Sequence, residues 1–132
     1  MSAASDYLES AILNYFFRNQ PVPQPTAHYL ALYISDPTDA DTGTEVSGGG
    51  YTRKQTTFGA PTQVGGKGVI SNNQKIEYDI ATTDWGKIAY WGIRDAATGG
   101  NLLSKGSFSR TEDVLTGNRF SVEIGNIQIT QE

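Results

Sequence analysis

The chain contains no cysteine, which excludes disulfide bonds and all thiol chemistry. Basic side chains are few: ten Lys and Arg against fourteen Asp and Glu give a formal net charge of −4. Nucleic-acid binding depends on clustered Lys and Arg, so we expect no such partner. No apolar run reaches the roughly 20 residues that cross a bilayer, and residues 1–6 lack the basic and apolar parts of a signal peptide. We therefore expect no membrane contact and synthesis in the cytoplasm without export.

Groups that could carry catalysis are also scarce. The one histidine, His28, has no cysteine partner and no local triad signature. Glu77 and Asp79 share one face of an alternating strand, which is typical of a solvated face. The segment 65–68 resembles a phosphate loop, but no Ser or Thr follows Lys67 and no helix pattern follows the loop. These features predict a protein that is not an enzyme and needs no cofactor.

An amphipathic helix is predicted over residues 6–18. Leu8, Ala11, Ile12, Tyr15 and Phe16 recur at helical spacing, and Leu13 and Phe17 widen the apolar stripe. Asp6 is the predicted N-cap, with Glu9 in the capping-box position. Prolines at 21, 23 and 25 exclude helix and predict an extended linker. The helix and its flanks take residues 1–20, the linker 21–26, and a β region 27–132, together forming a single domain.

The β region shows six segments of strand character: 27–34, 51–58, 74–80, 87–94, 102–109 and 120–129. Segments 27–34 and 87–94 are apolar on both faces, which predicts that both faces are covered. In segment 74–80, Ile76, Tyr78 and Ile80 are expected to point inward. The apolar parity of the last segment switches after Ile124, which predicts a bulge at Gly125–Asn126. The fold class is therefore mostly β, an antiparallel β-sandwich or open barrel of about six to eight strands with one N-terminal helix.

An acidic loop offers the best candidate for a metal site. Asp36, Asp39, Asp41 and Glu45 fall within ten residues, and their oxygens could bind a hard cation such as calcium. The spacing of an EF-hand is not met. Asp-Pro, Asp-Thr-Gly and Gly-Gly-Gly are also ordinary turn sequences. We expect a structural, metal-free turn.

Aromatic residues suggest a second kind of site. Tyr51 and Trp91 are candidates for stacking on a sugar or on a partner protein. The alternative is that Trp85 and Trp91 belong to the core, because large aromatics supply much of the buried area of a small domain. We favour the core interpretation for both tryptophans.

Several short sequence elements resemble those of one protein family. They are Leu30-Ala-Leu-Tyr33 followed by Ser35-Asp-Pro-Thr38, then Gly43-Thr-Glu-Val-Ser-Gly48 and Gly50-Tyr51-Thr-Arg53, and later Asp84-Trp85-Gly86 and Asp95-Ala-Ala-Thr-Gly99-Gly-Asn-Leu102-Leu103. Together they span nearly the whole chain and are similar to small tailed-phage proteins usually labelled tail-fibre proteins. Similar small β domains also serve as capsid decoration, or cement, proteins.

The resemblance implies a non-enzymatic structural protein of a tailed-phage virion, of tail-fibre type. A capsid decoration protein on the head is the alternative, and a carbohydrate-binding adhesin is a second one. The implied partners are copies of the same chain, as a trimer, and other virion proteins such as tail, baseplate or major capsid proteins.

The residues themselves also favour assembly. The helix carries more apolar surface than one sandwich face needs to cover, and an exposed apolar patch usually marks an interaction site. The residues expected at the interface are Leu8, Ile12, Tyr15, Phe16, Phe17, Tyr29 and Tyr33.

Overall fold

The structure is a computed structural model that describes residues 2–131. It contains one helix, α1 (Asp6–Phe17), and ten strands, all of them paired antiparallel. The strands are β1 (Ser2–Ala4), β2 (Tyr29–Tyr33), β3 (Lys54–Gln55), β4 (Thr62–Val64), β5 (Lys67–Ser71), β6 (Ile76–Glu77), β7 (Gly86–Arg94), β8 (Leu102–Val114), β9 (Ser121–Val122) and β10 (Gln128–Gln131). The predicted mostly-β class with one N-terminal helix is confirmed.

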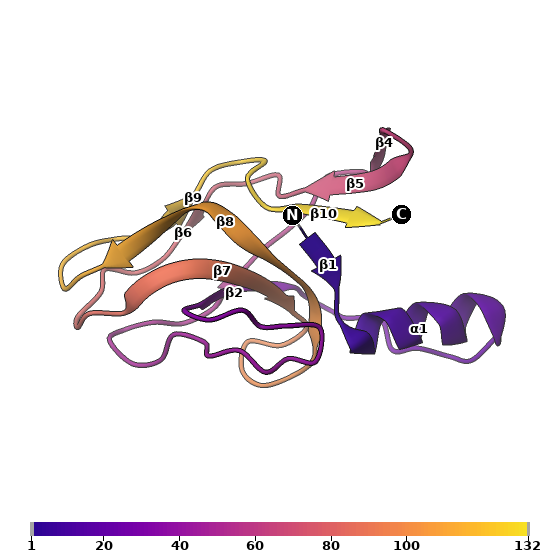
Figure 1. Ribbon diagram of the computed structural model, residues 1–132, viewed down its shortest axis with the longest axis horizontal. Helices are drawn as coiled ribbons and strands as arrows, with labels where there is room; N and C mark the ends of the chain where they lie inside the picture. The colour runs from indigo at the N-terminus through magenta and orange to yellow at the C-terminus, as the bar shows by residue number, and fades with distance from the viewer. Residues whose placement is uncertain (1, 132) are drawn as a thin grey trace.

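A five-stranded sheet, in the order β1-β8-β7-β2-β3, forms the body of the molecule (Figure 1). The two segments that are apolar on both faces became its central strands, β2 and β7. Leu30, Ala31 and Leu32 of β2 are fully buried, as is Ile88 of β7. A strand with neighbours on both edges and cover on both faces must be apolar on both sides, which explains the pattern.

The core lies between this sheet and the two-stranded sheet β6-β9. Ile76 pairs with Val122 across the small sheet, and both side chains are buried. Aromatic rings fill the space: Tyr78 packs edge-on against Trp85 and Phe120. The core consists of Leu30, Leu32, Val46, Ile76, Tyr78, Ala81, Trp85, Ile88, Trp91, Ile93, Val114, Phe120, Val122 and Ile127.

A separate three-stranded sheet, β10-β5-β4, projects beside the body on the same side as α1 (Figure 1). Ile70 of β5 lies directly opposite Ile129 of β10, while the neighbouring Val69 lies opposite Thr130. Successive side chains of a strand point to opposite faces. The sheet therefore has one apolar face with the isoleucines and one mixed face with Val69 and Thr130.

Two predicted details of these elements are wrong. The helix is capped by Ser5 rather than Asp6: the backbone N–H of Leu8 donates to Ser5 Oγ at 3.1 Å. The expected bulge at Gly125–Asn126 is instead a turn, closed by a hydrogen bond from the N–H of Asn126 to the carbonyl of Glu123. It separates β9 from β10, which pair in different sheets. The parity changes because the chain changes sheet.

Two other predicted strands are short. Segment 51–58 contains only β3, and segment 74–80 contains only β6. Ile76 and Tyr78 are buried as predicted, but Ile80 is 50% exposed. Strand β8 is longer than predicted and carries a bulge: Glu112 pairs with Ile88 and Ser107 with Tyr90, so four residues of β8 lie opposite Ala89.

Candidate assembly interface

Helix α1 leaves most of its apolar surface uncovered. It begins next to β1 and projects away from the strands (Figure 1), packing against β1 and β8 at its N-terminal half. Within the described chain, none of its residues is buried. The most exposed apolar side chains are Leu13 (57%), Tyr15 (53%), Phe16 (68%) and Phe17 (76%). Apolar side chains so far exposed, and next to one another, are typical of a surface that another molecule covers.

Beside the helix lies an apolar groove of about 690 Å³. One wall is the inner face of α1, with Leu8, Ala11 and Ile12, and another is the proline linker that follows the helix. Ile70 and Ile129, from the apolar face of the three-stranded sheet, form the opposite side. The remaining lining residues are Tyr7, Val22, Pro23, Pro25, Thr26, Ala27, His28, Gln55, Thr56, Thr57, Phe58, Ile93, Leu103, Ser104 and Gln131.

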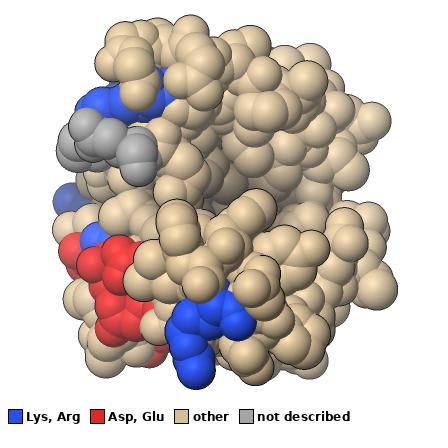
Figure 2. All heavy atoms as spheres, turned by 90° about the vertical axis from the view of Figure 1, so that its right-hand side faces the viewer, with Lys and Arg blue, Asp and Glu red and all other residues tan. Residues whose placement is uncertain are grey.

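No Lys, Arg, Asp or Glu is found among the described residues that line this groove. In Figure 2 the described surface around the hollow is mostly uncharged, with some basic side chains at its periphery and the acidic side chains gathered to one side. Burial of apolar surface contributes roughly 25 cal/mol per Å². With no charged group to desolvate, a groove of this kind favours binding of an apolar protein element.

The structure brings together some of the residues expected at an interface and separates others. Leu8 and Ile12 line the groove, while Tyr15, Phe16 and Phe17 form the exposed end of the helix. Tyr29 and Tyr33 lie elsewhere, in β2. Tyr29 is half-buried, and Tyr33 is only 1% exposed, with its hydroxyl accepting a hydrogen bond from Arg94. Within one chain Tyr33 is a core residue, as expected for a central strand.

The acidic loop is organised by arginines. Glu45 accepts two hydrogen bonds of 2.8 Å from Arg53, and Asp41 accepts two of 2.8 Å from Arg94. Asp36 accepts one from the backbone N–H of Thr38. The described residues contain no cluster of three or more His, Cys, Asp or Glu that could hold a metal ion, so Asp39 belongs to none. That the loop binds no metal stays a prediction.

In each ion pair, hydrogen bonds between the partners shift the pKa of a charged side chain. Burial alone would raise the pKa of Glu45, but the hydrogen bonds from Arg53 and Tyr51 outweigh it and hold that pKa below its usual value. Burial would likewise lower the pKa of Arg94, yet the hydrogen bonds to Asp41 and Tyr33 raise it. The Glu45 carboxylate and the Arg94 guanidinium therefore stay charged at neutral pH.

Sequence reasoning missed Arg53 and Arg94. Both also donate to backbone carbonyls of the loop between β7 and β8: Arg53 to Ala96 and Gly99, and Arg94 to Gly99 and Gly100. A planar guanidinium with five donors suits this task. The only available signal was their place in the Gly-Tyr-Thr-Arg element and at the end of an apolar strand.

Both residues proposed for ligand stacking pack against other side chains of the protein itself. Trp91 is 3% exposed and belongs to the core, as the favoured interpretation predicted. Tyr51 is half-buried, stacks on Tyr78 with ring centroids 6.0 Å apart, and donates its hydroxyl proton to Glu45 at 2.6 Å. Burial, then the hydrogen bond to Glu45, raises the pKa of this hydroxyl.

The elements that carried the family resemblance converge in this part of the structure. The indole N–H of Trp85, in Asp-Trp-Gly, donates to the carbonyl of Gly49 at 2.9 Å. Gly49 lies in the run Gly48–Gly50, where all three φ angles are positive, so side chains there would be strained. The carboxylate of Asp95 accepts hydrogen bonds from the backbone N–H and from the side-chain amide of Asn101. The shared elements therefore fix loops in place.

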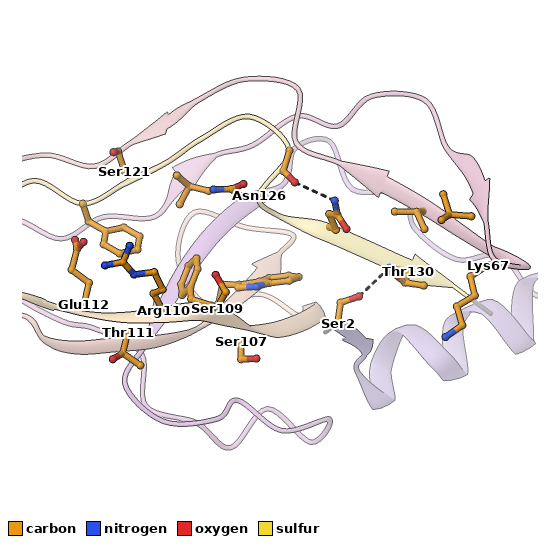
Figure 3. Close-up of a pocket in the computed structure, with 18 residues that line it drawn as sticks. Ser2, Lys67, Ser107, Ser109, Arg110, Thr111, Glu112, Ser121, Asn126 and Thr130 are labelled. Atoms are coloured by element: carbon orange, nitrogen blue, oxygen red, sulfur yellow. Dashed lines mark hydrogen bonds between the residues drawn. The ribbon is translucent and has the colours of Figure 1, made fainter.

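A second hollow, of about 950 Å³, lies between β8 and the segment 120–130 (Figure 3). Its lining mixes polar and apolar side chains, whereas that of the first is mainly apolar. Its lining includes Phe108 and Arg110 from the bulge of β8, Glu112 from the strand just after the bulge, and Phe120. Its other lining residues are Ser2, Val64, Lys67, Val69, Trp91, Ser107, Ser109, Thr111, Ser121, Val122, Gly125, Asn126, Gln128 and Thr130.

A mostly-β fold with loops held by partly buried ion pairs leaves an apolar helix end and an apolar groove open, and exposed apolar surface of this kind usually marks an interaction site. Comparison with known families agrees: the family model for Podophage GP4 fiber I protein gp80 matches residues 3–130. The chain therefore belongs to this phage fibre protein family, and the resemblance to phage tail-fibre proteins is confirmed. A comparison with curated proteins finds no match. Among the described residues, no helix is long and apolar enough to cross a membrane.

Proposed function

We propose that this protein is a non-enzymatic structural subunit of a tailed-phage virion, located on the tail, which assembles with copies of itself and with other virion proteins. Membership of a fibre protein family supports the virion role and favours the tail over the head. The observation that carries the assembly is the exposed apolar end of α1, Leu13 to Phe17, next to an uncharged apolar groove.

The free energy favours covering this surface. Fully burying one large apolar side chain contributes about 1.5–3 kcal/mol. Four such side chains more than half exposed forgo several kcal/mol, a large part of the roughly 5–15 kcal/mol that stabilises a whole domain. Closed symmetry is usual for soluble homo-oligomers. We propose a trimer because the phage proteins that the chain resembles are commonly trimeric.

Light scattering at micromolar concentration tests the assembly. The wild-type chain should have the mass of three chains, and the double variant Phe16→Ser/Phe17→Ser should be folded and smaller. Cryo-electron microscopy of virions carrying a tagged chain tests the location: density on the tail supports the proposal, and density on the capsid surface identifies a decoration protein instead.

A carbohydrate-binding role is a second candidate, and the hollow of Figure 3, with polar and aromatic side chains in its lining, favours it. The bulge of β8 presents Phe108 and Arg110 to this hollow, among hydroxyl and amide side chains. Bulges often re-aim side chains next to binding sites. A glycan array on the wild type and on Phe108→Ala/Arg110→Ala tests it, with Leu115→Ala as the control because Leu115 is exposed and lines neither hollow. Binding that only the double variant loses supports a sugar site, and no binding refutes it.

A further inference from the structure

No described part of its own chain covers the exposed end of α1. Along the helix, the residues that line the apolar groove are Tyr7, Leu8, Ala11 and Ile12, all in its N-terminal half. The exposed side chains Leu13, Tyr15, Phe16 and Phe17 follow them and lie outside that lining. A straight helix cannot turn its far end back into a groove beside its near end. The cover must therefore come from another molecule.

The same chain carries two matching apolar surfaces that do not overlap. The helix end offers three aromatic rings, and the groove offers a volume of about 690 Å³ without a charged lining residue. This volume falls within the range of about 300–1,000 Å³ that encloses a drug-sized ligand. Aromatic side chains bury roughly 150–250 Å² each, so the exposed parts of the three rings amount to roughly 300–500 Å². That is about half of the roughly 800 Å² that each partner buries in a stable interface.

We propose that the aromatic end of α1, residues 13–17, docks into the apolar groove of a second copy of this chain. This inference rests on the proposed function. It specifies which surface receives the helix end and that the contact joins the copies head to tail. The contact is helix-in-groove recognition, and it joins two different surfaces. Such a heterologous contact runs head to tail and closes into a ring when the rotation allows. The groove walls and floor supply the remaining contact area, through the proline linker and the sheet β10-β5-β4.

Symmetric packing of two helices against each other is the competing arrangement, and paired variants separate the two. The helix variant is Phe16→Ser/Phe17→Ser, which removes the inserted rings. The groove variant is Ile70→Lys, which places a charge on the groove face of β5. Its matched control is Val69→Lys, which puts the same charge on the opposite face of the same strand. Ile124→Ser, at a residue 64% exposed in the turn before β10, is the control for the helix variant.

The decisive measurement is the mass of the mixture by light scattering, after circular dichroism melts confirm that each variant is folded. We expect each variant alone to be monomeric and both controls to assemble like the wild type. An equimolar mixture of helix and groove variants should form a species of two chains. In that species the intact helix end of the groove variant binds the intact groove of the helix variant. No further chain can add, because the remaining helix end and the remaining groove both carry the substitutions. Ala27→Lys, at another half-buried lining residue, replaces Ile70→Lys if that variant does not fold.

Each other outcome is informative. An Ile70→Lys chain that still assembles, or a mixture that stays monomeric, overturns helix-in-groove docking and leaves assembly in place. A wild-type chain that is monomeric at micromolar concentration overturns both this inference and the proposed assembly.

Discussion

At the scale of single residues, the most consequential interaction is the pair Glu45–Arg53. The Arg53 side chain is 7% exposed and that of Glu45 is 24% exposed, and their two hydrogen bonds are both 2.8 Å. Tyr51 donates a third hydrogen bond to the same carboxylate. Removing one partner of a mostly buried pair leaves the other uncompensated, which costs more than the pair itself contributes.

We predict that Glu45→Gln lowers the free energy of unfolding at pH 7 by about 1–3 kcal/mol, because charged hydrogen bonds of Arg53 and Tyr51 are lost. The pKa of Glu45 is held below 4.5 in the folded state. A depressed pKa contributes stability above the unfolded-state value, and this stability is lost as the pH falls below about 4.5 through the folded-state pKa. The variant should therefore lose less stability between pH 7 and pH 3 than the wild type.

Urea titrations at both pH values measure this difference. Glu123→Gln is the control, because that side chain is 67% exposed and lies 3.7 Å from Lys75. Exposed ion pairs contribute little, so the control should match the wild type. Equal acid sensitivity of wild type and Glu45→Gln would contradict the assignment.

At the scale of elements, α1 depends on Ser5. Its hydroxyl oxygen accepts a hydrogen bond from the backbone N–H of Leu8, and its O–H donates one to the carbonyl of Leu102 in β8. Ser5 is 1% exposed, so one buried side chain both caps the helix and fixes it to the sheet.

Ser5→Ala should lower the free energy of unfolding by about 0.5–2 kcal/mol, the usual effect of removing an N-cap. Amide hydrogen exchange should accelerate in the first turn of α1 more than in β2 or β7, because the helix loses its local anchor. Ser10→Ala is the control, since Ser10 is exposed in the middle of the helix. If exchange in α1 is unchanged, the attachment does not depend on Ser5.

At the scale of the whole molecule, assembly should appear in the melting temperature. Association stabilises the folded state by mass action, so the melting temperature of the wild type should rise with protein concentration. That of Phe16→Ser/Phe17→Ser should not change. Calorimetry over a hundredfold range of concentration makes the comparison, and a wild-type melting temperature that is constant over this range would argue against assembly in solution.

The sequence by itself determined the helix, which it predicted over residues 6–18 and which the structure has over Asp6–Phe17, the two central strands and the mostly-β class. These depend on short-range periodicity, which records which side of each segment is covered. It also indicated the surplus apolar surface of the helix, because the seven large apolar side chains at 7, 8, 12, 13 and 15–17 exceed what one contact with a sheet can bury.

Only the tertiary structure decided which distant groups meet. Glu45 pairs with Arg53, and Asp41 with Arg94, because of the path that the loops take back to the sheet. The spacing of residues along the sequence does not predict that path. The change of parity after Ile124 predicted a bulge, and this was wrong because β9 and β10 belong to different sheets and a turn separates them. The apolar groove likewise exists only because a helix, a proline linker and a separate sheet come together, and contacts between segments so far apart in the chain are set by the folded core.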